Sequence, residues 1–179
     1  MLSVPKITDV LTLEEVKSQI YSRNNPTLTP IDIEFHASTV HRILELKKKH
    51  NIFMLGHNYM EPLVFGLSSA KEQGDSLALS MKAVETDSEI LIFNGVRFMA
   101  ETAKVLNPDK TILIADMNSG CSLADDFGAE QVRELKAKHP GVPVMIYINS
   151  YAEAKAECDV CCTSANAEQI AMELPGDEL

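Results

Sequence analysis

Short apolar runs alternate along the chain with longer stretches in which apolar residues recur at helical spacing. The apolar runs predict buried strands at 52–55, 90–93, 111–115, 143–148 and 159–162. The longer stretches predict helices at 63–73, 76–85, 97–106, 128–139, 152–157 and 166–174. Strands that alternate with helices in this way are typical of βαβ units. The sequence therefore predicts an α/β fold of three-layer α/β/α units with short parallel sheets.

The first part of the chain has a weaker pattern. We predict a short helix at 12–21, an extended linker with a proline-rich end at 25–30, and a helix that runs from about His36 to Lys49. A polar break at 118–121 separates three strands from two. The predicted organisation is an N-terminal extension at 1–35, a first α/β domain at 36–118, and an incomplete second α/β domain at 119–179.

Composition and charge narrow the possible partners. The chain is 45% hydrophobic and carries a net charge of −10, with no run of 18 apolar residues. This pattern argues against a membrane span, and the acidic charge argues against binding to nucleic acid or to anionic lipid. The N-terminus has no secretory signal, so we expect a cytoplasmic protein. An anionic ligand would have to be held by local groups.

Ligands of open parallel sheets bind beyond the carboxyl ends of the strands. His57 and Tyr59 follow the first predicted strand, where an imidazole and a phenol could serve proton transfer or anion binding. A capping histidine beside a packed tyrosine is an equally good interpretation. Tyr147 and Asn149 end the fourth strand on one face, where they either reach into a crevice or mark a strand end at the surface.

Two predicted helices begin with residues suited to an N-cap. Asp75 or Ser76 precedes the helix at 76–85, and Thr163 and Ser164 stand shortly before the helix at 166–174. Capping alone explains each of them. The free N–H groups of two such termini in matching positions could also hold two anionic groups of one ligand.

The four cysteines fall into two classes. Cys158, Cys161 and Cys162 resemble a redox or metal motif, but no nearby histidine completes a zinc site, and packing as small apolar residues is the better interpretation. Cys121 lies in a loop that follows a strand and precedes a helix, a placement that lowers a thiol pKa and suits a metal ligand. A single cysteine cannot hold a metal centre by itself.

Several motifs come in the order and spacing of one enzyme family. They include His57-Asn58-Tyr59, Gly74-Asp75-Ser76-Leu77 and the cysteine-bearing segment 120–125. The remaining motifs lie at 95–102, 106–110, 147–150, 152–156 and 162–167. In these segments, which extend over about 36–174, the chain resembles quinolinate synthase.

The resemblance implies an activity and a fold. The activity is the condensation of iminoaspartate with dihydroxyacetone phosphate to quinolinate in de novo NAD biosynthesis, with L-aspartate oxidase as the supplier of iminoaspartate. The fold is three similar α/β domains around a pseudo-threefold axis. A [4Fe–4S] cluster at the centre is held by one cysteine from each domain, and its open iron acts as a Lewis acid.

The resemblance also implies roles for the residues singled out above. Cys121 matches the first cluster ligand, and His57 and Tyr59 match residues for substrate binding and proton transfer. Substrate-binding positions are matched by Ser76, Tyr147, Asn149, Thr163 and Ser164. Family members are longer, so the two further cluster cysteines are expected beyond Leu179.

Two other classes of function remain open at this point. One is a non-catalytic α/β module, or inactive fragment, that binds a dicarboxylate. The other is a thiol-redox or zinc module built on residues 158–162. Iron uptake and zinc content distinguish these from the enzyme.

Overall fold

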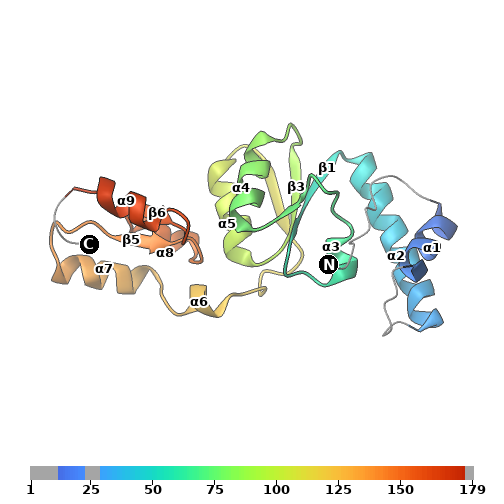
Figure 1. The fold of residues 1–179 in the computed structure, drawn as a ribbon, viewed down its shortest axis with the longest axis horizontal. Coiled ribbons are helices and arrows are strands. Elements are labelled where there is room, and N and C mark those ends of the chain that lie inside the picture. Colours follow the sequence, from blue (N-terminus) through green and yellow to red (C-terminus); the bar gives the residue numbers. More distant parts are fainter. Residues whose placement is uncertain (1–11, 23–28, 176–179) are drawn as a thin grey trace. The chain divides into compact units, whose positions relative to one another are not determined.

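The structure is a computed structural model that describes residues 12–22 and 29–175 (Figure 1). It consists of two compact units, which are described separately. The first contains the described residues up to Gly95 together with Leu106–Ala115. The second contains Val96–Val105 and the described residues from Asp116 onward.

The first unit is built around a parallel sheet. Its strands are β1 (Ile52–His57), β2 (Gln73–Gly74), β3 (Ile90–Asn94) and β4 (Thr111–Ile114). They lie in the order β2-β1-β3-β4, and all of their pairings are parallel. Its helices are α1 (Leu13–Ser22), α2 (Pro30–Lys49), α3 (Pro62–Phe65) and α4 (Ser76–Glu85). This arrangement confirms the predicted α/β class.

The two inner strands of the sheet, β1 and β3, are covered on both faces. Met54 of β1 and Ile92 of β3 are register partners, and both pack against a cluster formed by α1 and α2. The next pair, Leu55 and Phe93, points to the opposite face because side chains alternate along a strand. Both of these side chains are fully buried. The apolar runs of β1 and β3 therefore form strands covered on both sides, whereas the edge strand β4 leaves Leu113 46% exposed.

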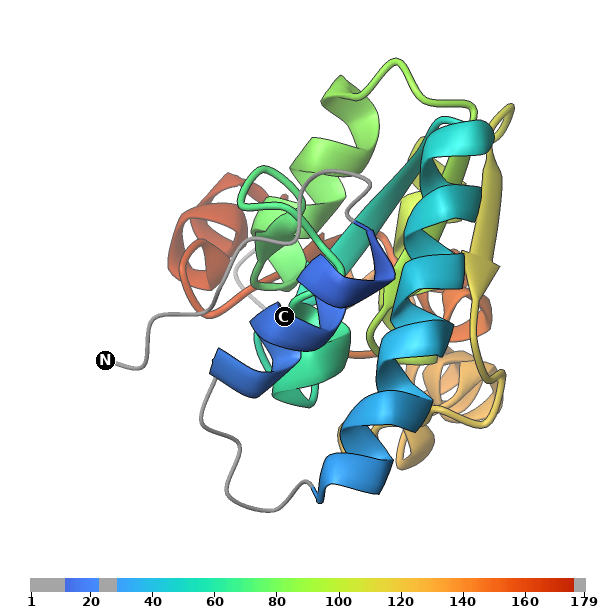
Figure 2. The same cartoon turned by 90° about the vertical axis from the view of Figure 1, so that its right-hand side faces the viewer.

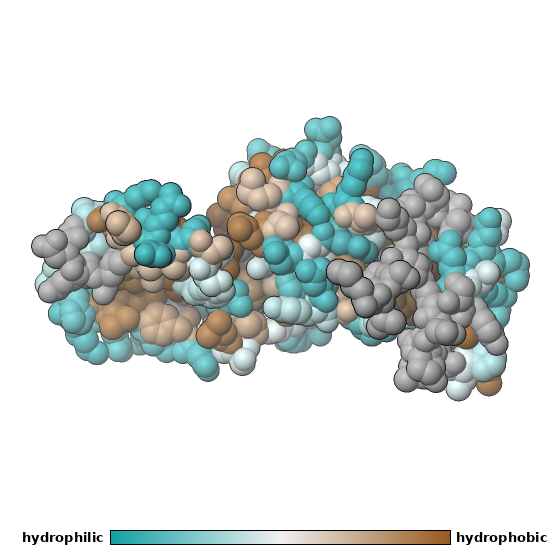
Figure 3. Space-filling view, viewed as in Figure 1, coloured by the Kyte–Doolittle hydropathy of each residue, from teal (hydrophilic) through white to brown (hydrophobic). Residues whose placement is uncertain are grey.

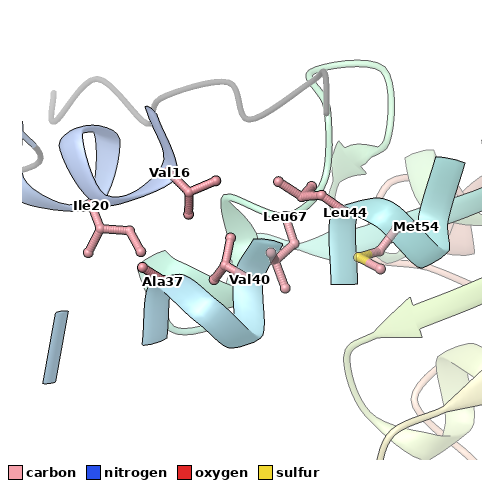
Figure 4. Close-up of a cluster of buried hydrophobic side chains, with 7 residues drawn as sticks. All are labelled: Val16, Ile20, Ala37, Val40, Leu44, Met54 and Leu67. Atoms are coloured by element: carbon pink, nitrogen blue, oxygen red, sulfur yellow. The ribbon is translucent and has the colours of Figure 1, made fainter. Parts of the chain in front are cut away.

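Helices α1 and α2 lie side by side, as Figures 1 and 2 both show. Their shared core is drawn in Figure 4 and joins them to β1 and to the loop after α3. It consists of Val16, Ile20, Ala37, Val40, Leu44, Met54 and Leu67.

The second unit has a smaller parallel sheet of β5 (Met145–Tyr147) and β6 (Val160–Cys162). Its helices are α5 (Arg97–Leu106, without its last residue), α6 (Ser122–Asp125), α7 (Ala129–Lys138), α8 (Ala152–Ala156) and α9 (Ala167–Glu173). Val132, Ile146 and Ala154 form its core, one from each of α7, β5 and α8.

The start of α2 differs from the prediction. The sequence predicts an extended linker before His36, whereas the helix begins at Pro30. Thr29 and Asp32 form a capping box, in which each side chain accepts a backbone N–H of the other, at 3.2 Å and 2.8 Å. Pro30 then occupies the first helical position, which its fixed φ favours. The part of the predicted linker at 23–28 lies outside the described residues.

The helix predicted at 63–73 is wrong beyond its first turn. Only α3 is helical there, and the chain then turns into β2, a strand that the pattern does not predict. The turn is stabilised by Glu72, whose buried carboxylate accepts the Ser69 N–H at 2.6 Å and the Met54 N–H at 2.9 Å. A contact to β1 therefore outweighs the local preference for helix.

The surface carries both hydrophobic and hydrophilic residues (Figure 3). In Figure 3 hydrophobic surface shows over the part of the chain that holds α4, among hydrophilic regions. On α4, Leu77, Met81 and Val84 are about half exposed, while Leu79 and Ala83 are fully buried. Among the helices of the described residues, none has the length and apolar character needed to cross a membrane.

Candidate active site

His57 is the last residue of β1, the strand at the middle of the first unit's sheet, and it is only 3% exposed. Its Nδ1 accepts the backbone N–H of Tyr59 at 3.3 Å. The Tyr59 ring stands edge-on to the imidazole with centroids 4.3 Å apart, although the tyrosine is 87% exposed. The strand therefore holds the imidazole in place, and the phenol lies at the surface beside it.

Burial sets the charge of this histidine. It lowers the pKa of His57 below the ordinary value of 6.5, and the negative charge of Asp75 offsets only part of that effect. The imidazole is therefore neutral at pH 7. Since Nδ1 accepts a hydrogen bond, the ring proton lies on Nε2, which is a donor for an oxygen atom of a ligand.

Asp75 and Ser76 directly follow β2, and Gly74 of β2 is the register partner of His57. Asp75 is the N-cap of α4, with its Oδ1 accepting the Ala78 N–H at 2.8 Å. Ser76 is the first helical residue and is partly buried, and its carbonyl accepts a hydrogen bond from the Ser80 hydroxyl at 2.8 Å. The structure thus decides between the two possible caps in favour of Asp75 and leaves the Ser76 hydroxyl at the same edge as His57.

Asn94 is a further polar residue at this edge that sequence analysis does not identify. It ends β3, pairs in register with Gly56, and is 8% exposed. Its Nδ2 has no hydrogen-bond partner among the residues that the structure describes. A buried donor of this kind is unusual. The sequence gives no sign of it, because an asparagine at a strand end normally lies at the surface.

The pKa of His57 predicts how stability depends on pH. The unfolded chain binds the His57 proton at a higher pH than the folded chain, so this contribution to the free energy of unfolding is complete above about pH 6.5 and is lost as the pH falls below it. A full one-proton difference changes that free energy by about 1.4 kcal/mol per pH unit. We expect urea unfolding between about pH 7.5 and 5.5 to show a shallower pH slope for His57→Asn than for the unaltered chain.

His50→Asn is the matched control, since His50 is exposed. It should leave the slope as it is in the unaltered chain. Equal slopes for the unaltered chain and His57→Asn would show that the buried imidazole does not titrate at low pH as argued.

Cys121 lies in the second unit, at the N-cap of the short helix α6. Its backbone is extended, with φ −140° and ψ 121°, and its side chain makes no capping hydrogen bond. The thiol is partly exposed and free, so it is available as a ligand. Residues 12–22 and 29–175 contain no group of three or more Cys, His, Asp or Glu side chains that could hold a metal ion. A metal held through Cys121 would therefore need further ligands beyond the residues that the structure describes.

The other predicted binding residues of this unit gather where β5 and β6 end. Tyr147 is 41% exposed and is the register partner of Cys162, so Tyr147 and Thr163 lie at the same end of the sheet. Asn149 follows Tyr147 and is partly buried. These residues therefore lie at or just beyond the carboxyl ends of β5 and β6.

Thr163 and Ser164 do not cap the following helix. The N-cap of α9 is Asn166, whose Oδ1 instead accepts the Thr163 N–H at 2.7 Å and the Thr163 hydroxyl at 2.9 Å. Ser164 is exposed within this turn. The predicted match between two capped helix termini is therefore wrong in detail, because the asparagine side chain closes a turn before the helix begins.

The remaining cysteines are free thiols without a metal geometry in the described part of the chain. Cys162 is buried, as its packing role predicts, and Cys158 packs against the core of the second unit. Burial raises the pKa of the Cys158 thiol. Cys161 is exposed, contrary to the packing prediction, because alternation along β6 turns it away from the face that buries Cys162.

The fold and these positions define a parallel α/β protein with polar side chains at the carboxyl ends of its strands. The family model described as quinolinate synthetase A protein matches residues 41–179. Quinolinate synthase 2 of Mesorhizobium japonicum is 46% identical over 159 residues, which cover 89% of this chain and 49% of the relative. Quinolinate synthase of Agrobacterium fabrum is 52% identical over 131 residues, covering 73% of this chain and 38% of the relative.

A third relative, quinolinate synthase of Pelobacter propionicus, is 49% identical over 134 residues, 75% of this chain and 43% of the relative. The chain belongs to the quinolinate synthase family. It spans about half or less of the length of these relatives.

Proposed function

We propose that this chain supplies the N-terminal part of a quinolinate synthase that condenses iminoaspartate with dihydroxyacetone phosphate in the cytoplasm. The observation that carries the proposal is the neutral, buried His57 at the carboxyl end of β1, in a chain about half identical to enzymes of that name. Both substrates carry negative charge, and the chain has a net charge of −10. Local donors must therefore hold them.

His57 meets this requirement as a hydrogen-bond donor. Its Nε2–H can donate to a carboxylate or carbonyl oxygen of the substrate without adding a charge that burial would disfavour. The Tyr59 phenol stands against the same ring and can exchange a proton with solvent, because it is exposed. The Ser76 hydroxyl adds a second donor at that edge. We assign Tyr147, Asn149, Thr163 and Ser164 to contacts with the same substrates.

Cys121 would hold one iron of a [4Fe–4S] cluster as a thiolate, with two further cysteines supplied by the rest of the full-length protein. When bound, the cluster would provide a Lewis-acidic iron for a substrate oxygen. The fit rests on the donor itself, a partly exposed free thiol with no capping bond to compete for it. L-aspartate oxidase is the proposed source of iminoaspartate.

The test is a two-part enzyme prepared without oxygen. The chain is reconstituted with iron and sulfide, alone and together with the C-terminal half of the Mesorhizobium japonicum relative, and quinolinate is measured after both substrates are added. We expect iron uptake and product from the two-part enzyme and neither from the chain alone, because the described residues carry one candidate ligand.

Iron uptake and quinolinate formation decide between the enzyme and a binding module. A two-part preparation that takes up no iron, or holds iron and makes no quinolinate, overturns the proposal. Binding of a dicarboxylate such as malate without iron would then favour a module that binds the substrate but lacks the chemistry.

A further inference from the structure

The segment that carries Cys121 is held by a hydrogen bond on each side of the cysteine. Before it, the backbone N–H of Arg97, the first residue of α5, donates to the Ser119 carbonyl at 2.8 Å. After it, the Tyr151 hydroxyl donates to Oδ1 of Asp125 at 2.6 Å, where α6 ends. Since α6 starts directly after Cys121, the cysteine lies between these two attachments.

Gly120 packs directly against the Tyr151–Asp125 hydrogen bond. A Cβ atom at this position would lie 3.2 Å from Oδ2 of Asp125 and 3.5 Å from the Tyr151 hydroxyl. The hydrogen bond to Asp125 raises the pKa of Tyr151. The phenol of Tyr151 thus lies beside Gly120, before the cysteine, and is hydrogen-bonded to Asp125, after it.

Tyr151 is itself held by α5. The guanidinium of Arg97 lies 4.5 Å from the centre of the tyrosine ring, a cation–π contact. Arg97 Nε also donates to Oε1 of Glu101 at 2.7 Å, and Oε2 of Glu101 accepts the Ala152 N–H at 2.8 Å. Glu101 thereby ties α5 to the backbone next to Tyr151. All of these residues belong to the second unit.

We propose that Tyr151 is a positioning residue for the Cys121 thiolate. The inference rests on the proposed function, in which that thiolate holds a cluster iron. The side chain of Cys121 makes no capping hydrogen bond that would hold it. A metal site needs ligands held in place by surrounding contacts. The hydrogen bond from the Tyr151 phenol to Asp125 supplies such a contact, and the sequence around Cys121 gives no sign of it.

Hydrogen exchange on the chain tests the contact itself. In Tyr151→Phe the peptide that covers 118–125 should exchange about tenfold faster, the factor expected for one lost hydrogen bond. Peptides of α7 and β5 should keep their protection. Asp125→Ala should give the same pattern. Arg133→Gln is the matched control, since it removes an exposed ion pair of the same unit, 2.7 Å long, with Glu157.

The two-part enzyme tests the positioning role. We expect Tyr151→Phe to alter the electron paramagnetic resonance signal of the reduced cluster and to shorten the cluster's lifetime in air about tenfold, within the range for contacts that orient metal ligands. Arg133→Gln should match the unaltered enzyme in both measurements.

An unchanged signal and lifetime in Tyr151→Phe overturn the positioning role, even if hydrogen exchange becomes faster, because the contact would then be structural only. If the unaltered two-part enzyme holds no iron, the proposed function fails and the positioning role fails with it. Iron uptake by the unaltered enzyme together with a normal Tyr151→Phe cluster rejects the positioning role alone.

Discussion

Cys121→Ser should remove the cluster from the two-part enzyme and lower quinolinate formation by more than about 100-fold, since changes to contacts that merely orient a metal ligand already cost about 10–100-fold. The serine hydroxyl is nearly isosteric with the thiol but is not a thiolate, the donor that iron–sulfur clusters use. The measurements are iron and sulfide content, the visible absorption of the cluster, and product formation.

Cys161→Ser is the matched control. Cys161 is an exposed free thiol of the same unit, so its loss removes one cysteine without touching the proposed ligand. It should retain full iron content and activity. The assignment of Cys121 fails if both variants hold the same amount of iron, or if Cys161→Ser loses the cluster and Cys121→Ser does not.

The elements that sequence analysis places well are those with a local cause. Strands β1 and β3 begin with the uninterrupted apolar runs at 52–55 and 90–93, and α4 and α5 have the predicted bounds at 76–85 and 97–106. Apolar periodicity is decided within one element, so it can be read without knowing its neighbours. The capping box of Thr29 and Asp32 is also local, and it shows that the true start of α2 was visible in the sequence.

The errors have a tertiary cause. The stretch after α3 has helical spacing, but the carboxylate of Glu72 is bound by backbone N–H groups of β1 and of its own turn. Likewise, Cys161 and Cys162 are equally apolar by sequence, and only the packing of the second unit determines which is buried. Such preferences depend on residues distant in the chain.

The candidate site shows the same division. His57, Ser76 and Cys121 were identified because motifs place them next to strand or helix ends. The contacts that shift the pKa of His57 or hold the Cys121 segment are not visible in the sequence. The charge of Asp75 raises the His57 pKa through space, and Tyr151 is hydrogen-bonded to Asp125, 26 positions away in the chain. Residues that carry chemistry are therefore easier to predict from the sequence than residues that support them.

Glu72→Ala should destabilise the first unit by about 3–5 kcal/mol, the range for removing one partner of a buried ion pair. The Glu72 side chain is 5% exposed and pairs with Lys47 of α2, which is 17% exposed, at 2.5 Å. The same carboxylate accepts backbone N–H groups of Met54 in β1 and of Ser69. Alanine would leave a largely buried ammonium and two amides without this acceptor.

The effect should extend to the candidate site, because Glu72 directly precedes β2, the strand whose Gly74 pairs with His57. Urea unfolding followed by far-ultraviolet circular dichroism gives the free energy, and hydrogen exchange of the β1 peptide shows whether the first unit is the part affected. Glu45→Ala is the matched control, since its partner Arg42 is 70% exposed and the pair is 3.6 Å long. It should change stability by less than about 1 kcal/mol, as exposed pairs do. Equal losses in the two variants would mean that the Glu72 carboxylate does not hold α2, β1 and the β2 edge together.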